Sequence, residues 1–173
     1  MRAFVAVEIP ASSGGRPVAP AHLTLRFLGE IAPARVEPIR ASLAPVGSRH
    51  APFVLEISGV GAFPSARAPR VVWAGVGQGR EEVVRLANDV RAALAPEVST
   101  QAEEPFVPHL TLFRVRTEAD RRLADDLLNG RRAAPAPFSV PVAAFLLKES
   151  ELGPGGARHR TVAEFPLSAP GDR

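Results

Sequence analysis

The chain has 173 residues, of which 46% are hydrophobic and 23% are charged, with a formal net charge of +3. This length suits a single domain with a substantial core. The absence of cysteine excludes disulfides and thiolate metal sites, and no apolar run is long enough for a signal peptide or a membrane span, so we expect a cytoplasmic protein.

Arginine dominates the basic residues. Lys148 is the only lysine, so 20 of the 21 basic residues are arginine. The arginine side chain is a planar, permanently charged fork that matches phosphate groups. A general bias of the sequence towards Arg, Ala, Pro and Gly would also explain the excess of arginine over lysine. Charge alone therefore permits a phosphate-bearing partner without showing one.

The first quarter of the chain contains two predicted strands and a helix. Apolar alternation predicts a strand over residues 2–9, and glycine and proline mark residues 11–21 as a loop. The stretch HLTLRFLG at 22–29 is typical of a second strand. Residues 33–43 have helical spacing, but Pro38 lies inside the pattern, so we expect this helix to kink or to begin later.

In the middle of the chain a strand pair precedes a helix. Alternation predicts strands over 53–63 and 71–76, joined by a loop that carries Arg67. Residues 77–96 form the clearest helix, because an apolar stripe lies opposite charged residues.

The last part of the chain contains three predicted strands and one helix. A strand is expected over 105–116 and a helix over 118–128, with Thr117 as its N-cap. One strand is predicted over 138–150, where a proline suggests a sheet edge or a bulge, and a final strand over 158–167.

The tetrapeptide His-Leu-Thr-Leu occurs twice, at 22–25 and 109–112. The element order around the two copies, in which strand pairs alternate with helices, predicts an α+β fold with helices outside mainly antiparallel sheets. We expect one domain over residues 1–173, built of two pseudo-symmetric interleaved lobes that each contribute one motif strand to a central cleft. An internally duplicated site needs no partner subunit, so we expect a monomer with no obligate protein partner.

Strand parity makes each motif a pair of polar side chains. Residues two apart in a strand share a face, so His22 and Thr24 project together, as do His109 and Thr111. The intervening leucines point into the core. Arg26 has the parity to reach the cleft as well, and an ordinary surface arginine is the equally weighted alternative.

Two imidazoles and two hydroxyls around one point suit in-line displacement at phosphorus. A neutral histidine can take a proton from water and a protonated one can give a proton to the leaving oxygen, because the unperturbed pKa is about 6.5. Threonine hydroxyls can donate to the non-bridging oxygens. The sequence has no acidic cluster of the kind that binds Mg²⁺, so we expect no metal and no cofactor.

Two other interpretations of the histidines are open. A single His-x-Thr strand is usually structural, and the duplication favours function. A two-histidine zinc site lacks an evident third ligand, because His50 and His159 lie in different contexts.

The motifs HLTLRFLGE and PFVPHLTLFR resemble those of the two-histidine phosphoesterases, specifically the RNA 2′,3′-cyclic phosphodiesterase or 2′-5′ RNA ligase-like family. The resemblance covers nearly the whole chain and is supported by RAFVAVEIP, GVGAFPSARAPRVVWAGV and TVAEFPL. It implies a bilobal α+β fold and hydrolysis of a terminal 2′,3′-cyclic phosphate to a 2′-phosphate.

The resemblance also implies roles for individual residues. His22 would donate a proton to the leaving 3′ oxygen, His109 would activate water, and Thr24 and Thr111 would hold the phosphate. Arg114 matches an arginine that contacts substrate phosphate. Because Arg114 is five residues from His109, its parity requires a bulge, the end of the strand or a strong twist.

Three further positions carry expectations. His159 stands where the family often has a tyrosine, and either contacts the substrate base or phosphate or is a surface histidine. Phe27 shares the parity of Leu25, so we expect it in the core. The family usually has an amphipathic helix between the first strand and the first motif, and here only residues 11–21 stand in its place.

RNA with 2′,3′-cyclic phosphate ends is the expected partner, with small cyclic nucleotide phosphates as the alternative. ATP-independent joining of such an end to a 5′-hydroxyl remains open, because the same acid and base serve both directions. A non-catalytic module that binds RNA ends or nucleotides also remains open. Six arginines could form a wider basic rim for a polynucleotide: Arg67, Arg70, Arg114, Arg116, Arg158 and Arg160.

Overall fold

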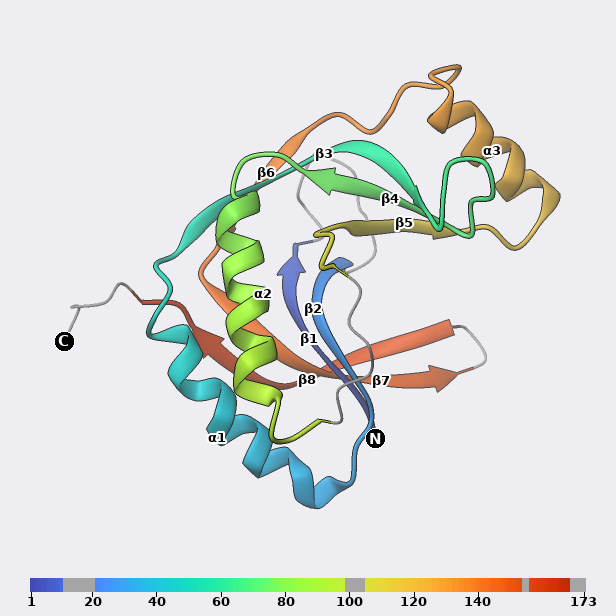
Figure 1. The fold of residues 1–173 in the computed structure, drawn as a ribbon. Coiled ribbons are helices and arrows are strands. Elements are labelled where there is room, and N and C mark those ends of the chain that lie inside the picture. Colours follow the sequence, from blue (N-terminus) through green and yellow to red (C-terminus); the bar gives the residue numbers. More distant parts are fainter. Residues whose placement is uncertain (11–20, 99–104, 154–155, 169–173) are drawn as a thin grey trace.

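The described residues form two four-stranded antiparallel sheets (Figure 1). The computed structural model describes residues 1–10, 21–98, 105–153 and 156–168. The strands of the first sheet are β1 (Arg2–Ile9), β2 (Ala21–Glu30), β7 (Ala144–Gly153) and β8 (Gly156–Pro166). The strands of the second sheet are β3 (Phe53–Phe63), β4 (Val71–Val76), β5 (Leu110–Arg114) and β6 (Phe138–Val142). The strand orders β2-β1-β7-β8 and β5-β4-β3-β6 place each motif strand at an edge.

Three α-helices cover the outside of the sheets in the described residues. They are α1 (Val36–Gly47), which follows a 3₁₀ turn at Pro33–Arg35, α2 (Arg80–Leu94) and α3 (Glu118–Leu128). α1 and α2 pack on each other over the first sheet, and α3 packs against β3 at the opposite end of the molecule (Figure 1). This is the predicted α+β fold with two lobes.

One apolar core joins the two sheets to α1 and α2. The buried stripe of α2 and the alternate residues of β1 meet the inner residues of β3 and β6 there. β7 and β8 return to the first sheet after the second sheet is complete, so the strands of the two sheets are interleaved along the chain. The shared core therefore fixes the two motif strands in one frame.

Most predicted elements are confirmed, including the bounds of β1, β3, β4 and α3. The single strand predicted over 138–150 is wrong. It divides at Ala143 into β6, which pairs with β3, and β7, which pairs with β1 in the other sheet. Both strands bury apolar residues, so the apolar pattern of the sequence continues from one sheet to the other and does not mark the boundary. β6 is an edge strand, the setting that Pro141 predicted.

Other bounds shift for local reasons. α1 begins at Val36, so Pro38 lies in its first turn, where a backbone N–H has no intrahelical acceptor. In the range 105–116 only Leu110–Arg114 form a strand. Residues 11–20 of the predicted loop lie outside the described residues, and so does the place of the family's additional helix.

β2 contains a β-bulge at the second leucine of its motif. Thr24 lies opposite Ala6 of β1, and the next paired residue, Arg26, lies opposite Val5. Leu25 is therefore an extra residue, and Arg26 and Phe27 after it change face; a second register shift follows at Leu28.

β5 contains the same irregularity at the equivalent leucine. Thr111 lies opposite Trp73 of β4, and Phe113 lies opposite Val72, so Leu112 is the extra residue. The duplicated sequence thus specifies a duplicated bulge.

These bulges decide the face of two side chains. Arg114 pairs with Val71, which places its side chain on the same face as that of Thr111. Of the explanations considered for the position of Arg114, the bulge is therefore the correct one. Phe27 pairs with Phe4 and is 66% exposed, so the prediction that it packs in the core is wrong. A one-residue insertion in the strand reverses the alternation on which that prediction was based.

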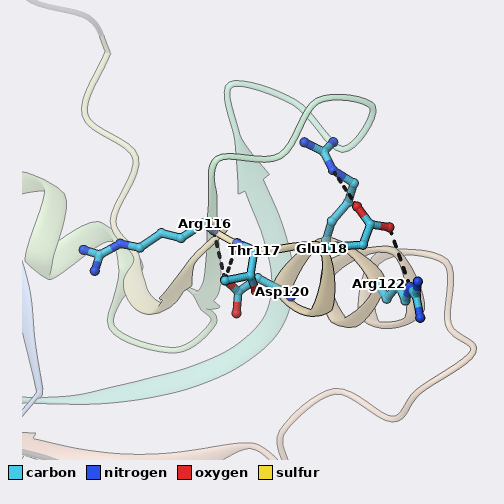
Figure 2. A network of polar contacts seen from close by, with 6 residues as sticks. Arg116, Thr117, Glu118, Asp120 and Arg122 are labelled. Carbon is cyan, nitrogen blue, oxygen red and sulfur yellow. Dashed lines mark hydrogen bonds and ion pairs between the residues drawn. The ribbon is translucent and has the colours of Figure 1, made fainter.

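The N-terminus of α3 is closed by a capping box (Figure 2). The Thr117 hydroxyl accepts a hydrogen bond from the Asp120 N–H at 3.1 Å, and the Asp120 carboxylate accepts one from the Thr117 N–H at 2.8 Å. The N–H groups of Arg116 and Thr117 lower the pKa of Asp120. The predicted N-cap is therefore confirmed.

Replacement of the cap should destabilise the protein. We expect Thr117→Ala to lower the free energy of unfolding in urea by about 1 kcal/mol, because the Asp120 N–H loses its acceptor. Thr117→Ser keeps the hydroxyl and should retain most of the stability. Equal losses in the two variants, or no loss with alanine, would contradict this account of the helix end.

Candidate active site

His22 lies in a cluster of aromatic rings from three strands. Its ring centroid is 4.7 Å from that of Phe4 on β1 and 4.8 Å from that of His159 on β8. The Phe4 and His159 rings are themselves 5.1 Å apart. Three neighbouring strands thus fix the imidazole of His22, and His159 stands beside it.

A buried ion pair lies next to this cluster. The Lys148 side chain on β7 is 6% exposed, and its Nζ donates to Glu8 Oε1 at 3.0 Å. Glu8 lies opposite His22 in the pairing of β1 and β2, and Lys148 lies opposite Phe4 in the pairing of β1 and β7. The only lysine of the chain is therefore part of the surroundings of His22.

Burial and positive neighbours keep His22 uncharged. Its pKa falls to about 4 because of burial, then because of His159 and Lys148, while Glu8 acts in the opposite direction. Burial and then Lys148 also lower the pKa of His159. At neutral pH the free protein thus holds His22 as neutral imidazole.

His109 is fixed in a different way. Its Nδ1 lies 2.7 Å from the carbonyl oxygen of Val107. A carbonyl oxygen only accepts hydrogen bonds, so Nδ1 carries the proton, and Nε2 of the neutral ring is a proton acceptor. The ring rests against Phe63 at 4.9 Å and Trp73 at 6.1 Å between centroids. The local backbone therefore selects the tautomer that a general base needs.

The motif strands meet at one cavity. Thr24 and His109 line the same cavity of about 1220 Å³, together with Phe27 and Phe63. β2 and β5 contact each other there. His22 precedes Thr24 by two residues on β2, and Thr111 is exposed on β5 two residues after His109. The structure thus brings Thr24 of the first unit and His109 of the second unit to one cavity, and whether His22 and Thr111 also reach it stays a prediction.

The remaining predicted residues lie around this cavity. Arg114 is exposed at the end of β5, on the face of Thr111. The parity argument for Arg26 is wrong, because the bulge places it opposite the buried Val5, although it still lines the cavity. His159 reaches the site through its contact with His22. Whether any of these side chains contacts substrate stays a prediction.

Alternation alone could not identify several neighbours of the site. Alternation predicts that Phe27 packs in the core, because nothing in the sequence marks a bulge. Lys148 carries a weak signal, since it is a lone lysine in an apolar strand, but its partner Glu8 is 140 positions away. Trp73 and Phe63 belong to predicted strands, and only the sheet pairing shows that they support His109.

The described residues contain neither a cluster of metal ligands nor a membrane-spanning helix. No three or more His, Asp or Glu side chains come together there as ligands for a metal ion. No helix in the same residues is long and apolar enough to cross a membrane.

Comparison with known proteins relates the chain to one family. A family model described as the 2′-5′ RNA ligase superfamily matches residues 10–152. The RNA 2′,3′-cyclic phosphodiesterase of Archaeoglobus fulgidus is 34% identical over 183 aligned positions, which cover 95% of this chain and 99% of that protein. A protein of the same name from Geobacillus stearothermophilus is 34% identical over 148 residues, and the chain spans only 45% of its length.

A solved structure shows the same fold. Escherichia coli LigT complexed with 3′-AMP superposes with a TM-score of 0.73 at 28% sequence identity. The alignment covers 96% of this chain and 98% of that protein.

The charges around His22 can be tested separately. Lys148→Met should raise the pKa of His22, because it removes a positive charge that disfavours imidazolium, and Glu8→Gln should lower it by removing a negative charge. An NMR titration of the histidine Cε1–H signals measures both shifts. His50, which lies 2.8 Å from Asp89 and away from the Lys148–Glu8 pair, is an internal control.

The opposite signs distinguish electrostatics from damage to the fold. A general loosening of the structure would relieve burial and raise the pKa of His22 in both variants. Shifts in the same direction, or none in either variant, would contradict the assigned role of the ion pair.

Proposed function

The chain belongs to the 2′-5′ RNA ligase superfamily, and on that basis we propose that it is an RNA 2′,3′-cyclic phosphodiesterase. It hydrolyses a terminal 2′,3′-cyclic phosphate to a 2′-phosphate by histidine acid/base catalysis, as a monomer without a metal ion. The observation that supports this most is the meeting of Thr24 and His109, from the two duplicated motifs, at one cavity.

His109 is the general base of this proposal. Its Nδ1–H donates to the Val107 carbonyl, so the lone pair of Nε2 is available to a water molecule. The base takes a proton as the water oxygen attacks phosphorus. A new phosphorus–oxygen bond forms on one side of the phosphate.

His22 is the general acid on the other side. The bond from phosphorus to the 3′ oxygen breaks, and His22 gives a proton to that oxygen, which leaves a 3′-hydroxyl and a 2′-phosphate. The low pKa of His22 in the free protein means that the imidazolium must form as substrate binds. The phosphate anion favours this, because a nearby negative charge raises a histidine pKa.

Other side chains hold the substrate. The hydroxyls of Thr24 and Thr111 donate to the non-bridging oxygens, which gain charge in the transition state. Arg114, brought by its bulge to the face of Thr111, pairs with the phosphate. Phe27, exposed on the face of Thr24, gives the nucleobase an apolar surface on which to stack.

The same groups permit a second reaction. If a 5′-hydroxyl replaces water as the nucleophile, the acid and base join two RNA ends through a 2′-5′ bond. The matching family model is described as the 2′-5′ RNA ligase superfamily, and this description supports ligation as the alternative. Product analysis with and without an acceptor RNA separates the two reactions.

Hydrolysis of an oligoribonucleotide with a 2′,3′-cyclic phosphate end should proceed in EDTA and leave a 2′-phosphate. His22→Ala and His109→Ala should each reduce kcat by about 100-fold or more, because each removes a proton-transfer group. His50→Gln, a histidine outside the site, serves as the matched control and should keep wild-type turnover.

Three outcomes would overturn this mechanism. A 3′-phosphate product would mean that the other ring bond breaks. Loss of activity in EDTA would indicate a metal ion. Binding of RNA ends without turnover would favour the non-catalytic module.

The pH dependence should be bell-shaped, because the base must be neutral and the acid protonated. Steady-state rates from roughly pH 4 to 9 measure the profile, and a flat profile would contradict the acid/base pair. In the complex the bound anion should raise the pKa of His22 above its value in the free protein. An NMR titration of the His22 signal without and with adenosine 2′-phosphate measures this shift, and an equal pKa in the two samples would contradict protonation of His22 on binding.

A further inference from the structure

The arginines of the described residues divide into paired and unpaired groups. Six of them form ion pairs with carboxylates: Arg35, Arg40, Arg121, Arg122, Arg131 and Arg160. Four others stand at one corner of the second lobe, which we call the basic corner: Arg67, Arg70, Arg114 and Arg116. All four are exposed, and the described part of the chain shows no carboxylate paired with any of their side chains.

Backbone hydrogen bonds bring the basic corner together. The Arg70 N–H donates to the Phe63 carbonyl at 2.8 Å, and the Arg70 carbonyl accepts from the Val115 N–H at 3.0 Å. The loop between β3 and β4, which carries Arg67, is thereby fastened to the end of β5. The four arginines thus come from two segments distant in the sequence, the β3–β4 loop and the end of β5, which backbone hydrogen bonds hold together.

The two acidic side chains that follow Arg116 most closely in the sequence, Glu118 and Asp120, bind groups other than its guanidinium. The Asp120 carboxylate accepts the N–H groups of Arg116 and Thr117 at 2.9 and 2.8 Å. Glu118 lies 4.0 Å from Arg121 and 3.6 Å from Arg122. Figure 2 shows the Arg116 side chain extended away from α3. The capping box therefore leaves the guanidinium of Arg116 available to a partner.

The basic corner begins at the candidate active site. Phe63, which binds the Arg70 backbone, has its ring 4.9 Å from that of His109. Arg114 shares the face of Thr111, and Arg116 follows it by two residues. A chain that leaves the site over the end of β5 would pass these side chains.

The first lobe offers less free positive charge near the site. Lys148 is paired with Glu8, and Arg160 is paired with Glu149, which leaves Arg158 as the exposed arginine of β8 without an ion pair in the described residues. Because, among the described residues, more unpaired arginines lie at the basic corner than on the first sheet, a polyanion bound at the site is expected to extend over the basic corner.

We propose that the basic corner binds the phosphodiester backbone of the nucleotides that precede the cyclic end. The preferred substrate is then an oligoribonucleotide and not a cyclic mononucleotide. This inference rests on the proposed function. Arginine pairs with phosphate through two parallel hydrogen bonds, and positively charged grooves follow single strands without reading their sequence.

The test compares two substrates and two charge-matched variants. The substrates are an oligoribonucleotide of about ten nucleotides with a 2′,3′-cyclic phosphate end and cytidine 2′,3′-cyclic phosphate. Arg67→Gln/Arg116→Gln removes two charges from the basic corner and leaves Arg114 in place. Arg80→Gln/Arg132→Gln removes two exposed charges at the start of α2 and beyond α3, for which the described residues show no ion pair.

We expect the corner variant to lose about tenfold in kcat/KM on the oligoribonucleotide and to keep its kcat/KM on the mononucleotide. Its kcat/KM on the oligoribonucleotide should also depend less on salt, by about 0.7 in logarithmic slope for each lost phosphate contact. The control variant should match the wild type on both substrates.

The outcomes separate the inference from the proposed function. An unchanged corner variant, or equal losses in the control, would overturn the inference while hydrolysis by the wild type upholds the proposed function. Loss on the mononucleotide as well would also overturn it, because the corner would then belong to the reacting site. Failure of the wild type on both substrates would overturn the proposed function, and the inference with it.

Discussion

One extra residue after the His-x-Thr unit of each motif strand, Leu25 in β2 and Leu112 in β5, determines which of the next side chains share the face of the threonine. A strand without a bulge would keep its alternation and turn Phe27 and Arg114 away from the histidines. The bulge keeps the His-x-Thr unit on the open face and returns the position five residues after each histidine to that face. Because β2 and β5 are edges of their sheets in the part of the chain that the structure describes, each strand can bend at this point without breaking pairing on a second side.

The duplicated frame holds two histidines in unlike environments. His22 is packed among Phe4, His159 and a buried ion pair, and its pKa falls to about 4. His109 donates from Nδ1 to the Val107 carbonyl and presents Nε2 as an acceptor. This difference supports opposite proton-transfer roles, in which one histidine is ready as a base and the other is charged by the substrate. The equivalent positions Phe27 and Arg114 also differ, since we propose that Phe27 stacks on the nucleobase and that Arg114 pairs with the phosphate.

The sequence could predict what depends on local pattern. Alternation and helical spacing located β1, β3, β4 and α3, and Thr117 was identified because a cap is a local hydrogen bond. Features that depend on long-range pairing could not be predicted. The run over 138–150 changes sheet at Ala143 without an apolar break, and the bulges reversed the faces expected for Arg26 and Phe27. Lys148 joins Glu8 only because β7 pairs with β1.

The most direct test of the duplicated site is a crystal structure of the protein with adenosine 2′-phosphate, the product class of the proposed reaction. The phosphate should lie between the two motif strands, with an oxygen within about 3.2 Å of a ring nitrogen of both His22 and His109. The hydroxyls of Thr24 and Thr111 should donate to its other oxygens. A phosphate bound to one motif strand alone, or outside the cavity between β2 and β5, would contradict the account.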